Sequence, residues 1–315
     1  MMRTAAPETT PQAPALVSVI MPCYNDGAYI QEAVDSVKRQ TYPAIELIVI
    51  DDGSNDPATR QALEQLDFPR LKRLHTRRLG PAGARNAGIR EAEGEYILPL
   101  DADDTIDPTY IEKAVQAMLD NPRVGIVYCE ADLFGEQTGQ WVLPRYALEY
   151  ELVDNCIFVT SLFRKRDWEK AGGFCETFKA GMEDYDFWLT LLANGCEVVQ
   201  LEETLFHYRI KPQSRSTSFI RDPAAVQETY RELYFRHRDF YAQHMDLYCV
   251  ALRSHLVALR QTVEREGASR AASGMGDPVS IYWQSIRTLK PRLAARIERC
   301  VLFKDRVKRW LARRH

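Results

Sequence analysis

In the first half of this chain, short apolar runs alternate with segments of helical periodicity, and this alternation constrains the fold most. The apolar runs expected to form strands are 16–21, 45–50, 71–75, 95–100 and 124–129. The segments expected to form helices between them are 28–39, 57–66, 80–92 and 108–119. Strands that alternate with helices of about 10–15 residues predict β-α-β units, and therefore an α/β fold with a mostly parallel sheet.

Beyond about residue 140 the alternation weakens. We expect helices at 166–171 and 183–193, a strand at 157–163, and a closing pair of strands at 197–201 and 204–210. Further along, the apolar spacing is helical. The whole pattern predicts a mixed, mostly parallel sheet that is flanked by helices and followed by a C-terminal helical extension.

Polar and acidic residues follow three of the expected strands directly. They are Pro22-Cys-Tyr-Asn25, Asp51-Asp52 and Asp101-Ala-Asp-Asp104. In open α/β sheets the ligand lies outside the carboxyl ends of the strands. We therefore expect these groups to converge on one edge of the sheet.

The acidic group after the fourth strand contains Asp101, Asp103 and Asp104. Three carboxylates within four residues repel one another unless a cation neutralises them. Such oxygen ligands suit Mg²⁺ or Mn²⁺, which bind one or two carboxylates together with substrate phosphates. The alternative is that these acids cap the helix that begins near Pro108.

Two further positions have both a functional and a structural interpretation. Asp52 can accept a hydrogen bond from a nucleobase, or it can form an Asx turn. Arg85, in the glycine-bearing stretch 80–88, can neutralise phosphate charge, or the stretch can be a tightly packed helix start. Neither a P-loop sequence nor G-x-G-x-x-G occurs, which argues against those nucleotide sites.

Glu183, Asp184 and His207 complete the set of candidates. Acids at a helix start suit the helix macrodipole, and one of them can also act as a general base toward an acceptor hydroxyl. His207 is either a structural histidine or a ligand that completes a metal shell.

Together these segments resemble the family 2 glycosyltransferases of GT-A fold. The matching segments, in the order of that family, are 17–25, 40–43, 46–56, 84–89, 94–97, 100–104, 172–174 and 183–184. The resemblance covers residues 16 to about 210. Each segment alone is short, but the ordered set is specific.

The resemblance implies a nucleotide-diphosphate sugar as donor, and it implies roles for single residues. Pro22, Tyr24 and Asn25 would flank the base and ribose. Asp52 would read the edge of the base, which is most often uracil in this family. Arg85 would lie near the nucleotide.

The acidic group and the later helix receive roles in the same way. Asp101, with Ala102 beside it, would approach the ribose or the waters of the metal. Asp103 would bind the Mn²⁺ or Mg²⁺ that bridges the two phosphates, and His207 matches a histidine that joins the metal in some members. The base would be Asp184, with Glu183 beside it, in a single displacement with inversion.

Two departures from the family pattern limit the prediction. The processive synthases of the family carry a Q-x-x-R-W motif and several membrane spans, and neither occurs here. We therefore expect the addition of one or a few sugars to a glycan or lipid-linked acceptor in surface polysaccharide, lipopolysaccharide or glycoprotein synthesis. The alternatives are a sugar nucleotidyltransferase, which would usually carry a glycine-rich loop after the first strand, and a degenerate transferase that serves as a scaffold.

The expected domains follow from the pattern and the resemblance. Residues 1–15 are a disordered lead-in, and 16–220 form the transferase domain. Its nucleotide-binding half is 16–130 and its acceptor half is 131–220. Residues 221–315 form a helical C-terminal region.

Charge and cysteine content suggest location and partners. The seven cysteines form no C-x-x-C pair, and no apolar leader or run of about 18 residues occurs, so we expect a cytoplasmic chain. The acidic body argues against nucleic-acid binding. Residues 290–315 form a basic amphipathic segment for an anionic membrane surface or a partner glycosyltransferase; the alternative is an ordinary terminal helix.

Overall fold

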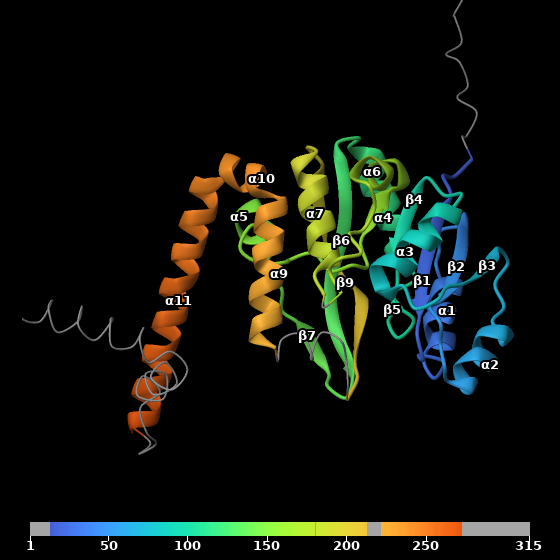
Figure 1. Cartoon of the computed structure of the whole chain (residues 1–315), viewed down its shortest axis with the longest axis horizontal. Coiled ribbons are helices and arrows are strands. Elements are labelled where there is room, and N and C mark those ends of the chain that lie inside the picture. The colour runs from blue at the N-terminus through green and yellow to red at the C-terminus, as the bar shows by residue number, and fades with distance from the viewer. Residues whose placement is uncertain (1–12, 180, 213–221, 273–315) are drawn as a thin grey trace, which may run out of the picture. The chain divides into compact units, whose positions relative to one another are not determined.

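A computed structural model describes residues 13–179, 181–212 and 222–272 of the chain, with side chains to residue 262. The chain divides into two compact units, Met1–Tyr248 and Cys249–His315. The first unit holds the sheet and most of the helices (Figure 1). The second unit begins within the last described helix.

The sheet in the described residues has nine strands in the order β3-β2-β1-β4-β8-β6-β9-β5, with β7 paired to β6. The strands are β1 (Val17–Cys23), β2 (Ile45–Asp51), β3 (Leu71–His75), β4 (Tyr96–Pro99), β5 (Thr105–Ile106), β6 (Val124–Gly135), β7 (Gly139–Trp141), β8 (Leu162–Arg164) and β9 (Glu197–Ile210). Parallel and antiparallel pairs both occur, so the predicted mixed α/β sheet is confirmed.

Helices flank this sheet and follow it. They are α1 (Ile30–Lys38), α2 (Pro57–Gln65), α3 (Gly80–Glu91), α4 (Tyr110–Asp120), α5 (Leu148–Glu151), α6 (Lys165–Ala171), α7 (Glu183–Ala193), α9 (Pro223–Arg236), α10 (Arg238–Gln243) and α11 (Met245–Ala272). Local sequence explains where α2 begins. The Asp56 side chain accepts from the backbone N–H groups of Ala58 and Thr59, and Pro57 occupies the first turn of α2.

The half of the sheet built from β1, β2, β3 and β4 is entirely parallel. Its central strands are apolar on both faces because helices cover both faces. Helix α3 approaches β1 and β2 closely at Gly88, where a Cβ atom would lie 2.7 Å from Ile50 Cδ1 and 2.9 Å from Ile20 Cγ2. Glycine at this position therefore seats α3, and with it Arg85, against the sheet.

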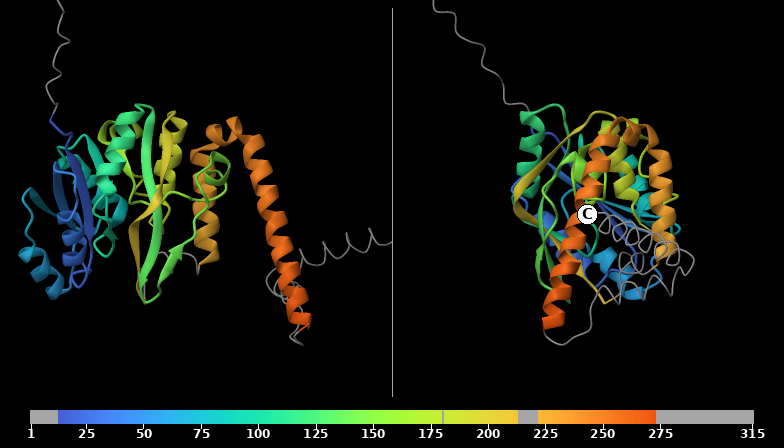
Figure 2. Two further views of the ribbon diagram at one scale, coloured as in Figure 1. Left: turned by 180° about the vertical axis from the view of Figure 1, so that it is seen from behind. Right: turned by 90° about the vertical axis from the view of Figure 1, so that its left-hand side faces the viewer.

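The direction of the remaining long strands decides where the site can lie. Strand β8 runs antiparallel to both β4 and β6, and β9 runs parallel to β6. Two reversals restore the original direction, so β6 and β9 run the same way as β4. They lie side by side in both views of Figure 2. The carboxyl ends of β1, β2, β4, β6 and β9 thus share one edge, which we call the carboxyl edge.

Two strand predictions are wrong. The expected pair 197–201 and 204–210 is the single strand β9, because Glu202 and Glu203 form a bulge opposite a register shift in β6. Of the expected strand 157–163, only Leu162 and Phe163 pair in the sheet, as part of β8. The backbone carbonyls of Ile157 and Thr160 accept instead from the Trp188 indole and the Tyr110 hydroxyl.

The C-terminal helices begin in the same unit as the sheet. A second apolar cluster joins α7, α9 and α10, which Figure 1 shows next to one another. Its buried members on these helices are Tyr185, Leu189, Leu192, Leu233, Phe240 and Tyr241. The packing therefore continues past residue 220, where the sequence suggested a boundary, as far as Tyr248.

No helix among the described residues is long and apolar enough to cross a membrane.

Candidate functional site

The loops after β1 and β2 are bound together at the carboxyl edge by Asn25. Its Oδ1 accepts from the backbone N–H groups of Asn55 (3.0 Å) and Asp56 (3.1 Å). Its own backbone N–H donates to Ser54 Oγ, at 3.1 Å. Asn25 has φ 58°, in the left-handed region, which asparagine tolerates better than most residues. The two loops therefore form one surface.

Asp52 holds the segment that leads into α3. Its carboxylate accepts from the backbone N–H groups of Leu79 (2.6 Å) and Gly80 (2.8 Å) and from Thr76 Oγ1 (2.6 Å). A carboxylate offers about four acceptor positions, so three are used. Asp52 thus holds the backbone before α3, and one of its acceptor positions remains for a further donor.

Tyr24 lies beside this segment. The guanidinium carbon of Arg78 stands 3.0 Å from the centroid of the Tyr24 ring, a cation–π contact. Pro22 and Tyr24 are half-buried, and both belong to the end of β1 or the turn after it. They line the carboxyl edge beside Asn25.

Arg85 connects the acidic loop after β4 to the start of α7. Its Nη2 donates to Asp101 Oδ1 at 2.7 Å, and its Nη1 donates to Glu183 Oε1 at 2.8 Å. Burial lowers the pKa of Arg85, but the charges of Asp101 and Glu183 outweigh it and leave that pKa raised. Asp184, the next residue, is half-buried and adds to this field. The two acidic groups named by the sequence therefore lie on the same side of the sheet.

The other acids of the loop are buried more deeply. Asp104 accepts from the Arg209 backbone N–H at 2.8 Å, and Arg209 Nε donates to the Asp103 carbonyl at 2.7 Å. Burial and the charges of Asp103 and Asp101 raise the pKa of Asp104 well above its usual range. Burial also raises the pKa of Asp103, with Asp101 adding to it. Ala102, between them, is buried in the core.

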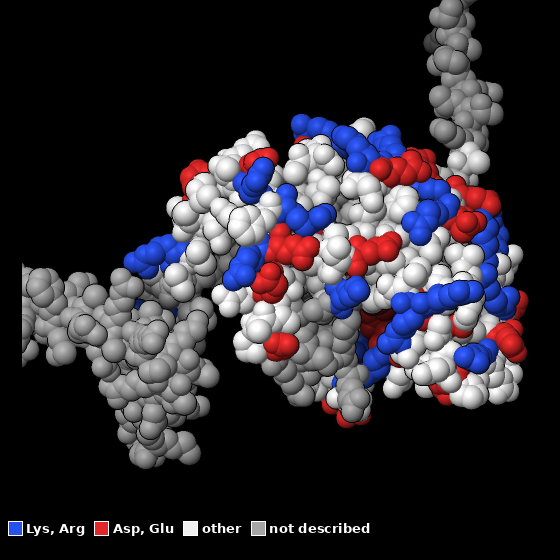
Figure 3. Space-filling view, viewed as in Figure 1, with Lys and Arg blue, Asp and Glu red and all other residues white. Residues whose placement is uncertain are grey.

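Lys211, at the end of β9, lies against this acidic loop. Its Nζ is 2.7 Å from Asp103 Oδ2 and 2.7 Å from Asp26 Oδ1. Burial lowers the pKa of Lys211, but the Asp103 and Asp26 charges outweigh it and raise that pKa. On the face shown in Figure 3, Lys and Arg side chains lie beside acidic ones in this way over the body of the chain.

His207 is directed to a different partner. It pairs with Thr105 across β9 and β5, and its Nδ1 is 2.6 Å from Asp132 Oδ1 on β6. No hydrogen bond or ion pair that joins His207 to Asp103 is found in the described ranges. Among the residues that the structure describes, no three His, Cys, Asp or Glu side chains are grouped as a metal site.

Sequence reasoning missed the residues that hold the site from behind. The Asn86 side chain bonds both backbone groups of Phe174, at 2.8 and 2.9 Å, and accepts from the Trp168 indole at 3.2 Å. Gly173 lies close enough that a Cβ would be 2.9 Å from Asn86 Oδ1. The segments 84–89 and 172–174 are therefore in direct contact. In the sequence, the one sign of this contact was that both segments belong to the same ordered set of motifs.

Asp186 is the second such residue. Its buried carboxylate accepts from Arg236 Nε at 2.7 Å and is 2.8 Å from His237 Nε2. Burial raises the pKa of Asp186, but the bonds from His237 and Arg236 outweigh it, so that pKa is lowered. The first turn of α7, which carries Asp184, is thus bound to the end of α9 and to His237, between α9 and α10.

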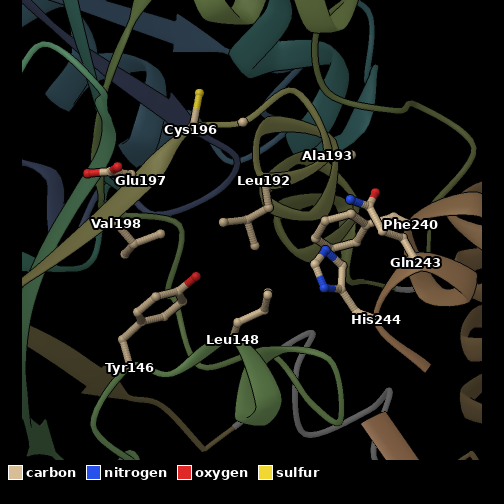
Figure 4. A pocket seen from close by; sticks show the side chains of 11 residues that line it. Tyr146, Leu148, Leu192, Ala193, Cys196, Glu197, Val198, Phe240, Gln243 and His244 are labelled. Atoms are coloured by element: carbon tan, nitrogen blue, oxygen red, sulfur yellow. The ribbon is translucent and has the colours of Figure 1, made fainter. Parts of the chain in front are cut away.

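A pocket of about 530 Å³ lies at the other end of α7. Leu192, Phe240, His244 and Tyr146 face into it, as Figure 4 shows. The start of β9 also lines it. Because α7 begins at the carboxyl edge and β9 begins at the opposite one, this pocket is separate from the acidic residues.

Several known proteins are similar to this chain in sequence. A family model described as glycosyl transferase family 2 matches residues 18–190. The uncharacterized glycosyltransferase RT0329 of Rickettsia typhi is 35% identical over 56% of this chain, which spans only 58% of that relative. The UDP-Glc:alpha-D-GlcNAc-diphosphoundecaprenol beta-1,3-glucosyltransferase WfgD of Escherichia coli is 31% identical over 66% of this chain and 82% of its own length.

Solved structures share the fold. The crystal structure of S. aureus TarS 1-349 in complex with UDP has a TM-score of 0.53 at 22% identity, and covers 65% of this chain and 63% of that one. The same TarS segment in complex with UDP-GlcNAc has a TM-score of 0.54 at 24% identity, with coverage of 64% and 61%.

Proposed function

Since the chain belongs to glycosyl transferase family 2, we propose that it is an inverting enzyme that moves a sugar from a nucleotide-diphosphate donor, UDP-linked, to an acceptor hydroxyl. The observation that carries the proposal is the Arg85 bridge. It brings the acid at the end of β4 and the acids at the start of α7 to one edge of the sheet. Donor and acceptor chemistry require such neighbouring groups.

The donor would lie across the loops after β1, β2 and β4. Pro22, Tyr24 and Asn25 offer a ring face and a fixed loop to the base and ribose. Asp52 has one acceptor position left for the base edge. WfgD is named for a UDP-Glc donor, and TarS was crystallised with UDP, which supports a uridine nucleotide.

Arg85, Asp101 and Ala102 would lie under the ribose and diphosphate. The Asp101 side chain is 35% exposed, so it can contact a ligand while it stays bonded to Arg85. Arg85 itself is buried and serves to hold the two acids at a fixed separation.

Asp184 would act as the base, with Glu183 as its support. Glu183 is buried and its Oε1 binds Arg85, whereas Asp184 is half-buried and can meet a substrate. The Asp184 carboxylate would take the acceptor proton, and the acceptor oxygen would form a bond to the anomeric carbon. The bond from that carbon to the diphosphate breaks at the opposite face, which inverts the configuration.

A divalent cation, Mn²⁺ or Mg²⁺, would bind beside Asp103. The ammonium of Lys211 already binds Asp103 and Asp26, so these carboxylates form a place for positive charge. Asp103 would hold the cation, with His207 as a further candidate ligand. When bound, the cation would offset the charge that grows on the departing diphosphate.

The acceptor is proposed from the relatives. WfgD is named for a diphosphoundecaprenol-linked acceptor, and the similar TuaG of Bacillus subtilis for teichuronic acid biosynthesis. We propose a glycan or lipid-linked glycan acceptor in the synthesis of a cell-surface polysaccharide.

Asp184→Asn tests the function. Transfer from UDP-sugars, followed by NMR of the anomeric product, should fall by about 10²–10⁴-fold, while UDP affinity measured by calorimetry stays unchanged. Asp167→Asn is the matched control because Asp167 lies in the first turn of another helix, α6. Full activity in Asp184→Asn, or a product of retained configuration, would remove the proposed base and the inverting mechanism.

A further inference from the structure

Lys211 stands where three strand-end segments meet. It follows β9 directly, Asp26 follows β1, and Asp103 follows β4. Its Nζ lies 2.7 Å from one oxygen of each acid. At the carboxyl edge, Lys211 therefore joins the end of β9 to the segments that follow β1 and β4.

The surroundings hold Lys211 in place but leave it accessible. The end of β9 before Lys211 is anchored, because the Arg209 backbone N–H donates to Asp104 Oδ1 and the Arg209 side-chain Nε donates to the Asp103 carbonyl. The Lys211, Asp26 and Asp103 side chains are 20%, 23% and 15% exposed. A ligand at the edge can thus reach this ion cluster without unfolding it.

Charge balance gives the cluster a function beyond stability. A nucleotide diphosphate is an anion, and it would have to approach Asp26, Asp101 and Asp103 at once. Like charges at these distances repel unless cations lie between them. Lysine is a compact charge on a flexible stem, so its ammonium can turn from a carboxylate oxygen to a phosphate oxygen while its backbone stays fixed.

We propose that Lys211 is the resident cation of the donor site. Its ammonium neutralises Asp26 and Asp103 while the site is empty, competes there with a divalent cation, and binds the donor diphosphate once the nucleotide arrives. This inference rests on the proposed function, because it needs a diphosphate ligand at the carboxyl edge.

Competition and diphosphate binding predict opposite effects of one substitution. In Lys211→Gln, Mn²⁺ should bind the nucleotide-free chain about tenfold more tightly, because Asp103 and Asp26 lose their competing cation. In the same variant, UDP at saturating Mn²⁺ should bind about tenfold more weakly, because the diphosphate loses a charged donor. Electron paramagnetic resonance of free Mn²⁺ measures the first affinity, and calorimetry with UDP measures the second.

Two further variants complete the experiment. Lys113→Gln is the matched control, because it removes an ammonium that is 2.5 Å from Glu203, away from the strand ends, and both affinities should stay unchanged. Lys211→Arg keeps the positive charge and should retain UDP affinity closer to that of the wild type. Circular dichroism confirms that each variant is folded, and Lys211→Met replaces Lys211→Gln if the latter is not.

The outcomes separate the two proposals. If the wild type fails to bind UDP, the proposed function is contradicted. Where the wild type does bind UDP, the folded Lys211 variant can still have the same affinity for Mn²⁺ or for UDP as the wild type. In that case Lys211 only forms structural ion pairs, and this inference is overturned.

Discussion

The buried side chain of Arg85 forms two ion pairs. It neutralises Asp101 and Glu183, which come from the loop after β4 and from α7. Removing a buried partner leaves the remaining charges without compensation, which usually costs more than the pair contributed. The residue is therefore expected to govern stability as well as the geometry of the site.

Arg85→Met should lower the free energy of unfolding by about 3–5 kcal/mol, since two carboxylates lose their counter-ion. Urea unfolding followed by circular dichroism measures the change. Arg90→Met, at the exposed end of the same helix, is the control and should change stability little. A similar small effect for both variants would contradict the bridging role of Arg85.

Glu151 gives the molecule a pH-dependent stability. Burial raises its pKa from 4.5 to about 8, and its Oε1 has no hydrogen-bond partner among the described residues. A carboxyl whose pKa is higher in the folded state stabilises fully below its unfolded pKa, and this contribution is lost as pH rises to the folded pKa.

We therefore expect the unfolding free energy of the wild type to fall between about pH 5 and pH 8 more steeply than that of Glu151→Gln. Urea titrations at several pH values measure both slopes. Burial also raises the pKa of Asp104, so Asp104 contributes to the wild-type slope as well. The difference between the slopes of the two proteins therefore isolates the contribution of Glu151. Parallel slopes would show that Glu151 is not the titrating group.

At the residue level, sequence motifs located candidates but not their contacts. Asp101, Asp184 and Arg85 stand in short ordered motifs, and their shared edge follows from strand direction. Lys211 carries no such signal, because its partner Asp26 is 185 residues away and only the path of β9 brings them together. A lysine directly after the last strand could have been noted as a candidate on topology alone.

At the level of elements, prediction succeeded where nearly all residues of a segment are buried in the same apolar core. Strands β1, β2 and β4 are apolar on both faces and separated by helices, so each was visible as a run. Strands β5 and β7 are too short for periodicity to show. The β9 bulge and the irregular stretch 157–161 depend on tertiary partners, which local sequence does not contain.

The contact between the first loop and α2 gives a prediction at this scale. A Cβ added to Gly27 would lie 2.4 Å from Thr59 Cα, a backbone atom that cannot turn away. Gly27→Ala should separate the loop from α2 and lower stability by about 1–3 kcal/mol. Thermal unfolding measures it, with Ala28→Ser, at the adjacent exposed position, as control. Equal melting temperatures would show that the helix yields without cost.

For the molecule as a whole, the basic segment 290–315 lies outside the described residues, and its role stays a prediction. Its mixture of arginine, lysine and apolar residues suits the surface of an anionic bilayer. The full chain should float with vesicles that contain anionic lipid, and a chain that ends at residue 289 should not. Equal flotation of the two chains would end the membrane proposal.

The contacts of Asp186 with Arg236 and His237 bear on how this chain can be divided for engineering. The family match ends at residue 190, so a graft that joined the matched part to another scaffold would discard both basic partners. The Asp186 carboxylate would then stay buried without its two basic partners, in the same helical turn as Asp184. Any module exchange must therefore be cut after Tyr248, where the compact unit itself ends.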